Sequence, residues 1–323
     1  MKRNVIFISL LILVLGIYFI NKYKSSNETI VPTVAFLSLT SVDNKTFKGF
    51  KEQMEQYGWI ENKNINYLIS KPAQKVENLQ PMVKSVVDKK PDLILVSSTP
   101  ATQEVKRATV ENNIPVVFCP VNDPVGSNIV KNPKAPEKNI TGIRLPAGDV
   151  KRFEWLHLIV PSAQNILLPF AYKDLGAVTA RKTIKDIASG IGLNIIEKEF
   201  NGDIKGYLDS LPKDIDAIFL PRESNVEEKI EEFVAYANKH KLPLCVPSYQ
   251  QVEKGALFTY GFIHYELGRD AAKMVDRMIK GIKPIDIPVK TGSAHLVINE
   301  STAKKLGLEI PTKAVRNAYK IIK

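Results

Sequence analysis

The chain has 323 residues, of which 44% are hydrophobic and 24% are charged, an ordinary globular composition for about two domains. This composition excludes a disordered or collagenous protein, and two cysteines cannot by themselves build a disulfide framework or a four-ligand zinc site. The net charge of +11 is spread along the chain rather than gathered in one stretch, so the sequence predicts no nucleic-acid partner.

The first 24 residues have the pattern of an export signal. A positive start, Met1-Lys2-Arg3, precedes the uncharged residues 5–20 and the segment Lys22-Tyr23-Lys24. A helix of about 16 residues spans roughly 24 Å, less than a hydrocarbon core of about 30 Å, which favours a signal peptide. No small-residue cleavage site follows, however, and a tyrosine between lysines suits a membrane interface. We therefore predict an uncleaved anchor over residues 1–24, with a cleaved signal as the alternative, and an extracytoplasmic location for the rest.

The segment that follows alternates apolar runs with amphipathic helices. Strands are predicted near residues 34–37, 65–69, 92–96 and 114–120, and helices near 47–57, 76–87 and from Pro100 onward. Several of these strands are apolar on both faces. Continuous apolar strands that alternate with helices indicate a parallel sheet covered on both sides.

The second half of the chain repeats this order. Strands are predicted near residues 166–170, 193–196, 216–220 and 242–247, and helices near 178–188 and 225–237. Asp216 opens its strand as Asp92 does in the first half, and each half ends in a strand flanked by prolines. The repeat predicts an α/β fold of two similar doubly wound parallel-sheet lobes. A linker over residues 139–146 joins the two lobes, and a helix at 265–280 and a strand at 295–299 are predicted to pack across both.

In doubly wound sheets, ligands collect beyond the carboxyl ends of the strands, so polar residues there are candidates for a binding site. In the first half these are Thr40, Ser41, Ser98, Thr99 and Asp123. Hydroxyls at a helix start favour a carboxylate or another anion, although the same groups can simply cap their own helix. Asp123 can either pair with a ligand ammonium or start a turn with the proline that follows it.

The second half offers an equivalent set of candidates at its strand ends. They are Tyr172, Glu223, Ser224, Asn225, Ser248 and Tyr249. The tyrosines can present an aromatic face to a ring or a cation, although a packed tyrosine is the commoner role. Glu223 is the acidic residue of this set.

Catalysis and metal binding find little support in the sequence. The four histidines, His157, His240, His264 and His295, are scattered without metal-ligand spacing, and each is interpreted as a core or surface residue. Cys119 and Cys245 lie in apolar runs and are interpreted as small buried hydrophobic residues. We predict that the chain is not an enzyme and that it needs no cofactor or metal.

Eight short motifs occur in the order and spacing of the tryptophan/tyrosine-binding type of ABC-transporter substrate-binding proteins, which the chain resembles from about Pro32 to Ile310. They are Thr99-Pro100-Ala101-Thr102-Gln103, Ile114-Pro115-Val116-Val117-Phe118, Asp123-Pro124-Val125-Gly126, Asn139-Ile140-Thr141-Gly142, Lys254-Gly255-Ala256, Gly261-Phe262, Tyr265-Glu266-Leu267-Gly268-Arg269 and Leu296-Val297-Ile298-Asn299.

The resemblance implies a type I periplasmic binding protein fold, with two lobes, three crossings between them and a small molecule in the cleft. The predicted boundaries are residues 32–143 plus about 262–286 for the first lobe, 147–258 plus about 293–310 for the second, and 311–323 for a basic tail. Relatives often carry an acidic residue at the position of Glu223 and another at that of Ser248. This chain has Ser248 at the second of these positions, so one expected partner of a ligand ammonium group is missing.

The leading hypothesis is an extracytoplasmic solute-binding component of an ABC importer. It captures a small polar ligand, with amino acids and aromatic metabolites among the candidates, by hinge closure, and then docks on a membrane permease. A sensory ligand-binding protein that reports to a receptor or kinase is the alternative. A sugar-repressor-like regulator would need a helix-turn-helix before the first lobe, where this chain has an apolar segment.

Overall fold

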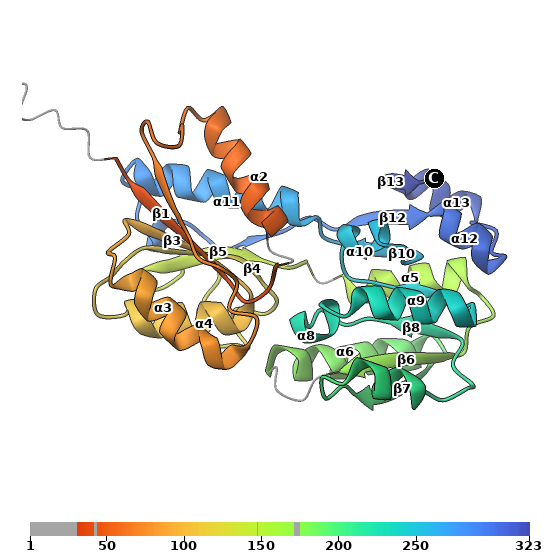
Figure 1. Cartoon of the computed structure of the whole chain (residues 1–323). Coiled ribbons are helices and arrows are strands. Elements are labelled where there is room, and N and C mark those ends of the chain that lie inside the picture. Colours follow the sequence, from red (N-terminus) through yellow and green to blue (C-terminus); the bar gives the residue numbers. More distant parts are fainter. Residues whose placement is uncertain (1–30, 42–43, 147, 171–174) are drawn as a thin grey trace, which may run out of the picture.

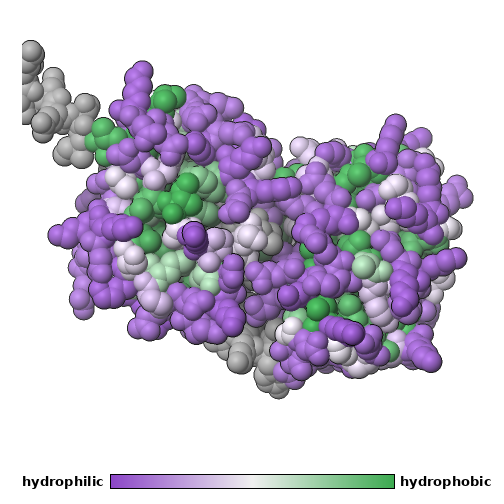
Figure 2. Space-filling view, in the orientation of Figure 1, coloured by the Kyte–Doolittle hydropathy of each residue, from purple (hydrophilic) through white to green (hydrophobic). Residues whose placement is uncertain are grey.

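A computed structural model describes residues 31–41, 44–146, 148–170 and 175–323. It contains two sheets, each covered by helices, and the chain passes between the two parts at their junction (Figure 1). The space-filling view shows a largely hydrophilic surface on both lobes, with a narrower waist where they meet (Figure 2). The predicted anchor over residues 1–24 lies outside the described residues. Within the described ranges, no helix is long and apolar enough to cross a membrane.

The first sheet has six strands in the order β11-β5-β4-β3-β1-β2, and every neighbouring pair is parallel. Its strands are β1 (Thr33–Ser38), β2 (Asn66–Ile69), β3 (Leu93–Ser97), β4 (Val116–Val121), β5 (Ile140–Arg144) and β11 (Lys290–Thr291). Strands β1, β3 and β4 are buried nearly throughout, which explains their continuous apolar sequences.

The second sheet has seven strands in the order β13-β12-β10-β9-β8-β6-β7. Its strands are β6 (Asn165–Phe170), β7 (Asn194–Glu199), β8 (Ala217–Phe219), β9 (Leu244–Cys245), β10 (Phe258–Gly261), β12 (His295–Asn299) and β13 (Lys320–Ile322). Among the described strands of this sheet, β10 and β12 pair antiparallel and the other neighbours pair in parallel.

The two sheets repeat one strand order, as the sequence predicts. The order β5-β4-β3-β1-β2 of the first sheet matches β10-β9-β8-β6-β7 of the second. This is the doubly wound order in which the chain reverses direction beside the first strand of each lobe. The predicted α/β fold of two similar lobes is therefore confirmed.

Helices cover both faces of both sheets. Those of the first lobe are α2 (Asn44–Gln56), α3 (Leu79–Val87), α4 (Thr99–Thr109) and α11 (His264–Ile279), with short 3-10 turns at Val76–Asn78 and Pro284–Asp286. Those of the second lobe are α5 (Asp149–Ile159), α6 (Leu175–Gly190), α7 (Ile204–Asp209), α8 (Ser224–Glu227), α9 (Ile230–His240), α10 (Tyr249–Glu253), α12 (Glu300–Leu306) and α13 (Thr312–Asn317). Each sheet thus has two hydrophobic cores, one on each face.

The late helix α11 belongs to the first lobe because it packs closely against α2. A Cβ added at Gly49 would lie 2.0 Å from the carbonyl oxygen of Tyr265, and one at Gly268 would lie 1.9 Å from that of Thr46. Only glycine allows the two helices to approach this closely. The contact explains how a segment 200 residues further along the chain completes the first lobe.

Three connections join the lobes, as the resemblance implied. They run from β5 to α5, from β10 to α11 and from β11 to β12. Because β5 and β10 leave their sheets at their carboxyl ends, the carboxyl edges of both sheets lie on the side of the junction. The candidate residues of the two lobes therefore occupy facing edges.

The C-terminal segment differs from the expectation of a separate basic tail. Residues 311–323 form α13 and β13, and β13 pairs in parallel with β12. The sequence signal is weak because Lys320-Ile321-Ile322 is short and Ala314 is the buried residue of α13. The cysteines behave as predicted, since Cys119 and Cys245 are fully buried and neither forms a disulfide bond.

Candidate functional site

The first lobe gathers hydroxyl groups at the carboxyl edge of its sheet. Ser38 at the end of β1 is the register partner of Ser97 at the end of β3. The residues that follow these strands, Thr40 and Ser98, are both at least nine-tenths buried. The adjacent strands therefore hold a cluster of hydroxyls within a largely apolar sheet.

Ser98 has an unusual backbone conformation at this edge, with φ 79° and ψ 150°. Side chains other than glycine rarely adopt such angles, and the strain costs about 1–3 kcal/mol. Its carbonyl accepts the first hydrogen bonds of α4, from the Thr102 N–H at 3.1 Å and the Thr102 hydroxyl at 2.7 Å. The Ser98 hydroxyl, in contrast, does not cap α4 and bonds to no described residue. The capping alternative therefore fails for this side chain.

The other candidates of the first lobe fall into two groups. Thr40 and Thr99 are buried beside Ser98, whereas Ser41 is exposed. Asp123 starts a turn, as one of its two interpretations predicted, because its Oδ1 accepts from the N–H groups of Val125 at 3.1 Å and Gly126 at 3.0 Å. A ligand role for Asp123 stays a prediction beside this structural one.

The second lobe places an acid and an amide network at its own edge. Glu223 follows β8 and is 2% exposed, and its carbonyl accepts the first hydrogen bonds of the α8 segment. Next to it in the sheet, the Ser248 N–H donates to Gln251 Oε1 at 3.1 Å. The Gln251 amide then donates to Glu227 Oε2 at 3.2 Å. These bonds hold the start of α10 against the α8 segment.

Tyr249 is half-buried and its side chain is already engaged. The hydroxyl donates to Glu253 Oε1 at 2.6 Å, and Lys320 of β13 lies 4.7 Å from the ring centroid and also contacts the hydroxyl. Asn225 is exposed. Ser224 opens α8, but its side chain is outside the description, and Tyr172 lies outside the described residues altogether.

A buried ion cluster supports this edge, and the sequence analysis missed it. Asp149 at the start of α5 binds Arg152 through Oδ1 at 2.6 Å and Arg222 through Oδ2 at 2.5 Å. Arg152 also donates to the carbonyl of Leu220 at 2.9 Å, and its guanidinium lies 3.9 Å from the Phe219 ring centroid. We call Asp149, Arg152 and Arg222 the ion triad.

The ion triad ties the first connection to the end of β8. Arg222 donates to the carbonyl of Pro146, within that connection, at 2.5 Å, and it precedes Glu223 in the chain. Burial alone would raise the pKa of Asp149, but the charges of Arg222 and Arg152 outweigh it and lower the pKa to about 2. The carboxylate is therefore ionised at neutral pH. The only sequence signal was the spacing of three residues between Asp149 and Arg152, which places the two side chains on one face of a helix.

The two edges together carry groups that can bind a small polar molecule. They present hydroxyls, backbone N–H groups at the start of α4 and a carboxyl group. Among the described residues, no group of three or more histidine, cysteine or acidic side chains is placed to hold a metal ion. Burial raises the pKa of the Cys245 thiol to about 12, so this cysteine is protonated at neutral pH.

Comparison with known proteins gives a family for most of the chain. A family profile described as ABC transporter substrate binding protein matches residues 31–322. The chain is 26% identical over 269 residues to the tyrosine-binding protein of Clostridioides difficile. The aligned region covers 82% of this chain and 77% of that protein.

Two solved structures have the same fold over nearly their whole length. One is a conserved domain protein from Vibrio cholerae, with a TM-score of 0.85, 25% identity and coverage of 90% of this chain and 99% of that chain. The other is an ABC domain in complex with L-Trp from Streptococcus pneumoniae, with a TM-score of 0.84, 24% identity and the same coverage.

Proposed function

The chain belongs to the family of ABC transporter substrate-binding proteins, and on this premise we propose that it captures a small polar ligand between its lobes for import. Members of this family bind substrates outside the cytoplasm and are not enzymes. We also propose that residues 1–24 anchor the chain to the membrane, and that the ligand-bound form docks on a membrane permease. Contacts to both lobes would stabilise the closed form over the open one.

The observation that carries the proposal is the pair of facing carboxyl edges with buried polar groups. A hydroxyl that is buried without a hydrogen-bond partner is costly unless something else satisfies it. Ser98 carries such a hydroxyl and also a strained backbone, a combination that is typical of binding sites. The ion triad fixes the opposite edge, so Glu223 is held by a rigid support.

Aromatic amino acids are the first ligands to test, because one relative is named for tyrosine and one solved relative holds L-Trp. Their carboxylate suits the hydroxyls and N–H groups at the start of α4, an eleven-residue helix. Their ammonium group suits Glu223, the buried acid that directly precedes α8. Ser248 adds no second charge there, so we expect Glu223 to carry this interaction.

Titration calorimetry of the purified full chain with L-tyrosine and L-tryptophan tests the proposal. We expect one site per chain, and Glu223→Gln to weaken binding by about tenfold or more, since bonds to charged groups contribute about 1.5–3 kcal/mol. Glu231→Gln is the matched control, because Glu231 is exposed and pairs with Lys254 on the outer surface. Equal affinities for the two variants would overturn the assignment of Glu223, and no binding of any small polar metabolite would overturn capture.

A further inference from the structure

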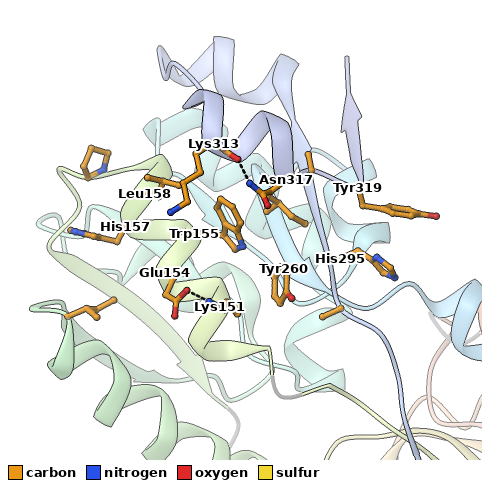
Figure 3. Close-up of a pocket in the computed structure, with 15 residues that line it drawn as sticks. Lys151, Glu154, Trp155, His157, Leu158, Tyr260, His295, Lys313, Asn317 and Tyr319 are labelled. Carbon is orange, nitrogen blue, oxygen red and sulfur yellow. Dashed lines mark hydrogen bonds and ion pairs between the residues drawn. The ribbon is translucent and has the colours of Figure 1, made fainter.

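A second concave surface lies in the second lobe, away from the facing edges. It is a groove of about 1150 Å³ between α5 on one side and β12 and α13 on the other (Figure 3). Ligand sites of proteins commonly have about 300–1,000 Å³, so the groove is large enough for a small molecule. No residue of the candidate site lines it.

One end of this groove lies where the three connections enter the second lobe. Lys151 stands in the first turn of α5, Tyr260 is the last residue but one of β10, and His295 opens β12. The first connection also packs directly on the end of β10, because a Cβ added at Gly148 would lie 3.0 Å from the carbonyl oxygen of Tyr260. A molecule bound at this end would touch residues that flank all three connections.

The groove is lined by flat aromatic faces. Trp155 stands at its centre with Tyr260 beside it, and His295 and Tyr319 stand on the opposite wall (Figure 3). The ring centroids of His295 and Tyr319 lie 4.5 Å apart, although Tyr319 remains 59% exposed. The indole N–H of Trp155 is buried and bonds to no described residue. Planar rings of this kind favour a planar ligand.

The charges of the groove favour an anion. Its lysines are Lys151 and Lys313, and its acidic residue is Glu154. Lys151 pairs with Glu154 at 2.5 Å, whereas Lys313 makes no ion pair with a described residue. The lining therefore has one lysine in excess. An anionic group near Lys313 would gain a charge-assisted contact that the lobe itself does not supply.

We propose that this groove is a second binding site, specific for a planar aromatic anion such as an aromatic carboxylate. The ring packs against Trp155, and the anionic group points to Lys313, which lies beside Trp155 on the side away from His295 and Tyr319 (Figure 3). Because Lys151, Tyr260 and His295 flank the three connections, the groove ligand also changes the affinity of the cleft between the lobes, and the cleft ligand changes the affinity of the groove by the same factor.

Heavy-atom quenching of tryptophan fluorescence tests the site. The chain has two tryptophans, so Trp59→Phe leaves Trp155 as the single emitter. Iodobenzoate added to this full-length variant should quench the emission with a saturable, one-site curve. If Trp59→Phe destabilises the first lobe, the unsubstituted chain serves instead, and Trp155→Phe, which retains Trp59, should then lose the saturable phase.

Two controls distinguish specific binding of an anion from non-specific binding to an apolar surface. Iodobenzyl alcohol has the same ring without the charge. Lys313→Glu should weaken the binding of iodobenzoate by about fivefold and leave the affinity for the alcohol unchanged. Lys304→Glu, on the exposed side of α12, should change neither. Linear quenching, equal affinities of the acid and the alcohol, or insensitivity to Lys313→Glu would each overturn the proposal. Equal affinities would indicate an apolar contact surface for a protein partner instead.

Discussion

The two lobes bury different polar groups where the chain passes between them. In the first lobe, at the second connection, His264 is fully buried with its Nδ1 3.1 Å from the Thr46 hydroxyl, and its Nε2 bonds to no described residue. In the second lobe, at the first connection, the ion triad buries three charges. Burial, reinforced by the charge of Lys45, lowers the pKa of His264 to about 4, so the imidazole is neutral where the triad is ionised.

This difference shows which properties two lobes of the same topology have in common. Both lobes place the carboxyl edges of their sheets at the junction, because strand order and crossover direction are the same. Strand order does not determine how the buried polar groups at each connection are satisfied. One lobe uses a neutral ring among apolar side chains, and the other uses a salt-bridged network, so the two should respond differently to substitution and to acid.

The largest effect is expected from breaking the ion triad. Arg152→Met leaves the Leu220 carbonyl without its donor and deprives Asp149 of one of its two cations. Loss of one partner of a buried ion pair costs about 3–5 kcal/mol of unfolding free energy. Urea unfolding of the second lobe, followed through Trp155 in the Trp59→Phe background, measures this loss. Lys254→Met, which removes the exposed pair with Glu231 in the same lobe, should cost less than about 1 kcal/mol; similar losses for both would contradict the account.

Acid should weaken the two lobes in different pH windows. The pKa of His264 is about 4 when folded and about 6.5 when unfolded, so the unfolded chain binds more protons between these values. The first lobe should therefore lose about 3 kcal/mol of stability as the pH falls from about 6.5 to 4. Unfolding followed through Trp59 in Trp155→Phe chains should show this loss, and His264→Gln should abolish it.

The ion triad predicts a lower window for the second lobe. The pKa of Asp149 is lowered from 3.8 to about 2, so its contribution to stability is complete above about pH 4 and is lost as the pH falls towards 2. Trp155 emission should report this loss, and Asp149→Asn should flatten it. A common transition of both lobes near one pH, unchanged by either substitution, would show that these groups do not set the acid response.

A smaller effect, with opposite signs for two properties, is expected at Ser98. Ser98→Gly should raise the unfolding free energy by about 1 kcal/mol because glycine tolerates the backbone angles. It should also weaken binding of the cleft ligand by about fivefold because the hydroxyl is lost. Lys241→Gly, at the left-handed end of α9, is the control, since it should change stability without changing affinity. A Ser98→Gly chain with unchanged affinity would remove Ser98 from the site.

The smallest effect is expected from the ion pair between the lobes. Lys45 of α2 and Glu253 of α10 lie 3.1 Å apart and are partly exposed. Such pairs contribute about 0–1 kcal/mol and are screened by salt. Lys45→Met should therefore shift the unfolding free energy by less than about 1 kcal/mol, and high salt should erase the difference. A larger, salt-independent shift would mean that this contact, rather than the connections, holds the lobes together.

The sequence predicts the fold better than the site for a physical reason. Apolar periodicity reports how each strand and helix is buried, and this suffices for the two lobes and for most helix positions. Short elements such as β11 and β13 have two or three residues and leave no periodic signal. Their places depend on pairing with other strands: β11 pairs with β5, which lies far away in the chain, and β13 pairs with β12 across two intervening helices.

Side-chain roles were predicted less completely, because they depend on contacts between distant segments. Sequence position alone brought out Ser98 and Glu223, which both lie at strand ends. It could not show that Tyr249 is engaged by Glu253 and Lys320, since Lys320 lies 71 residues away. The ion triad was missed for the same reason, because Arg222 meets Asp149 only through the fold.

The most direct test of capture between the lobes is small-angle X-ray scattering of the full chain with and without a bound aromatic amino acid. The account predicts that saturating L-tyrosine or L-tryptophan, whichever binds in calorimetry, reduces the radius of gyration of the chain. It also predicts that a Ser98→Ala, Glu223→Gln chain does not contract at the same ligand concentration. Binding with an unchanged radius, or equal contraction of the double variant, would contradict a ligand held between these two edges.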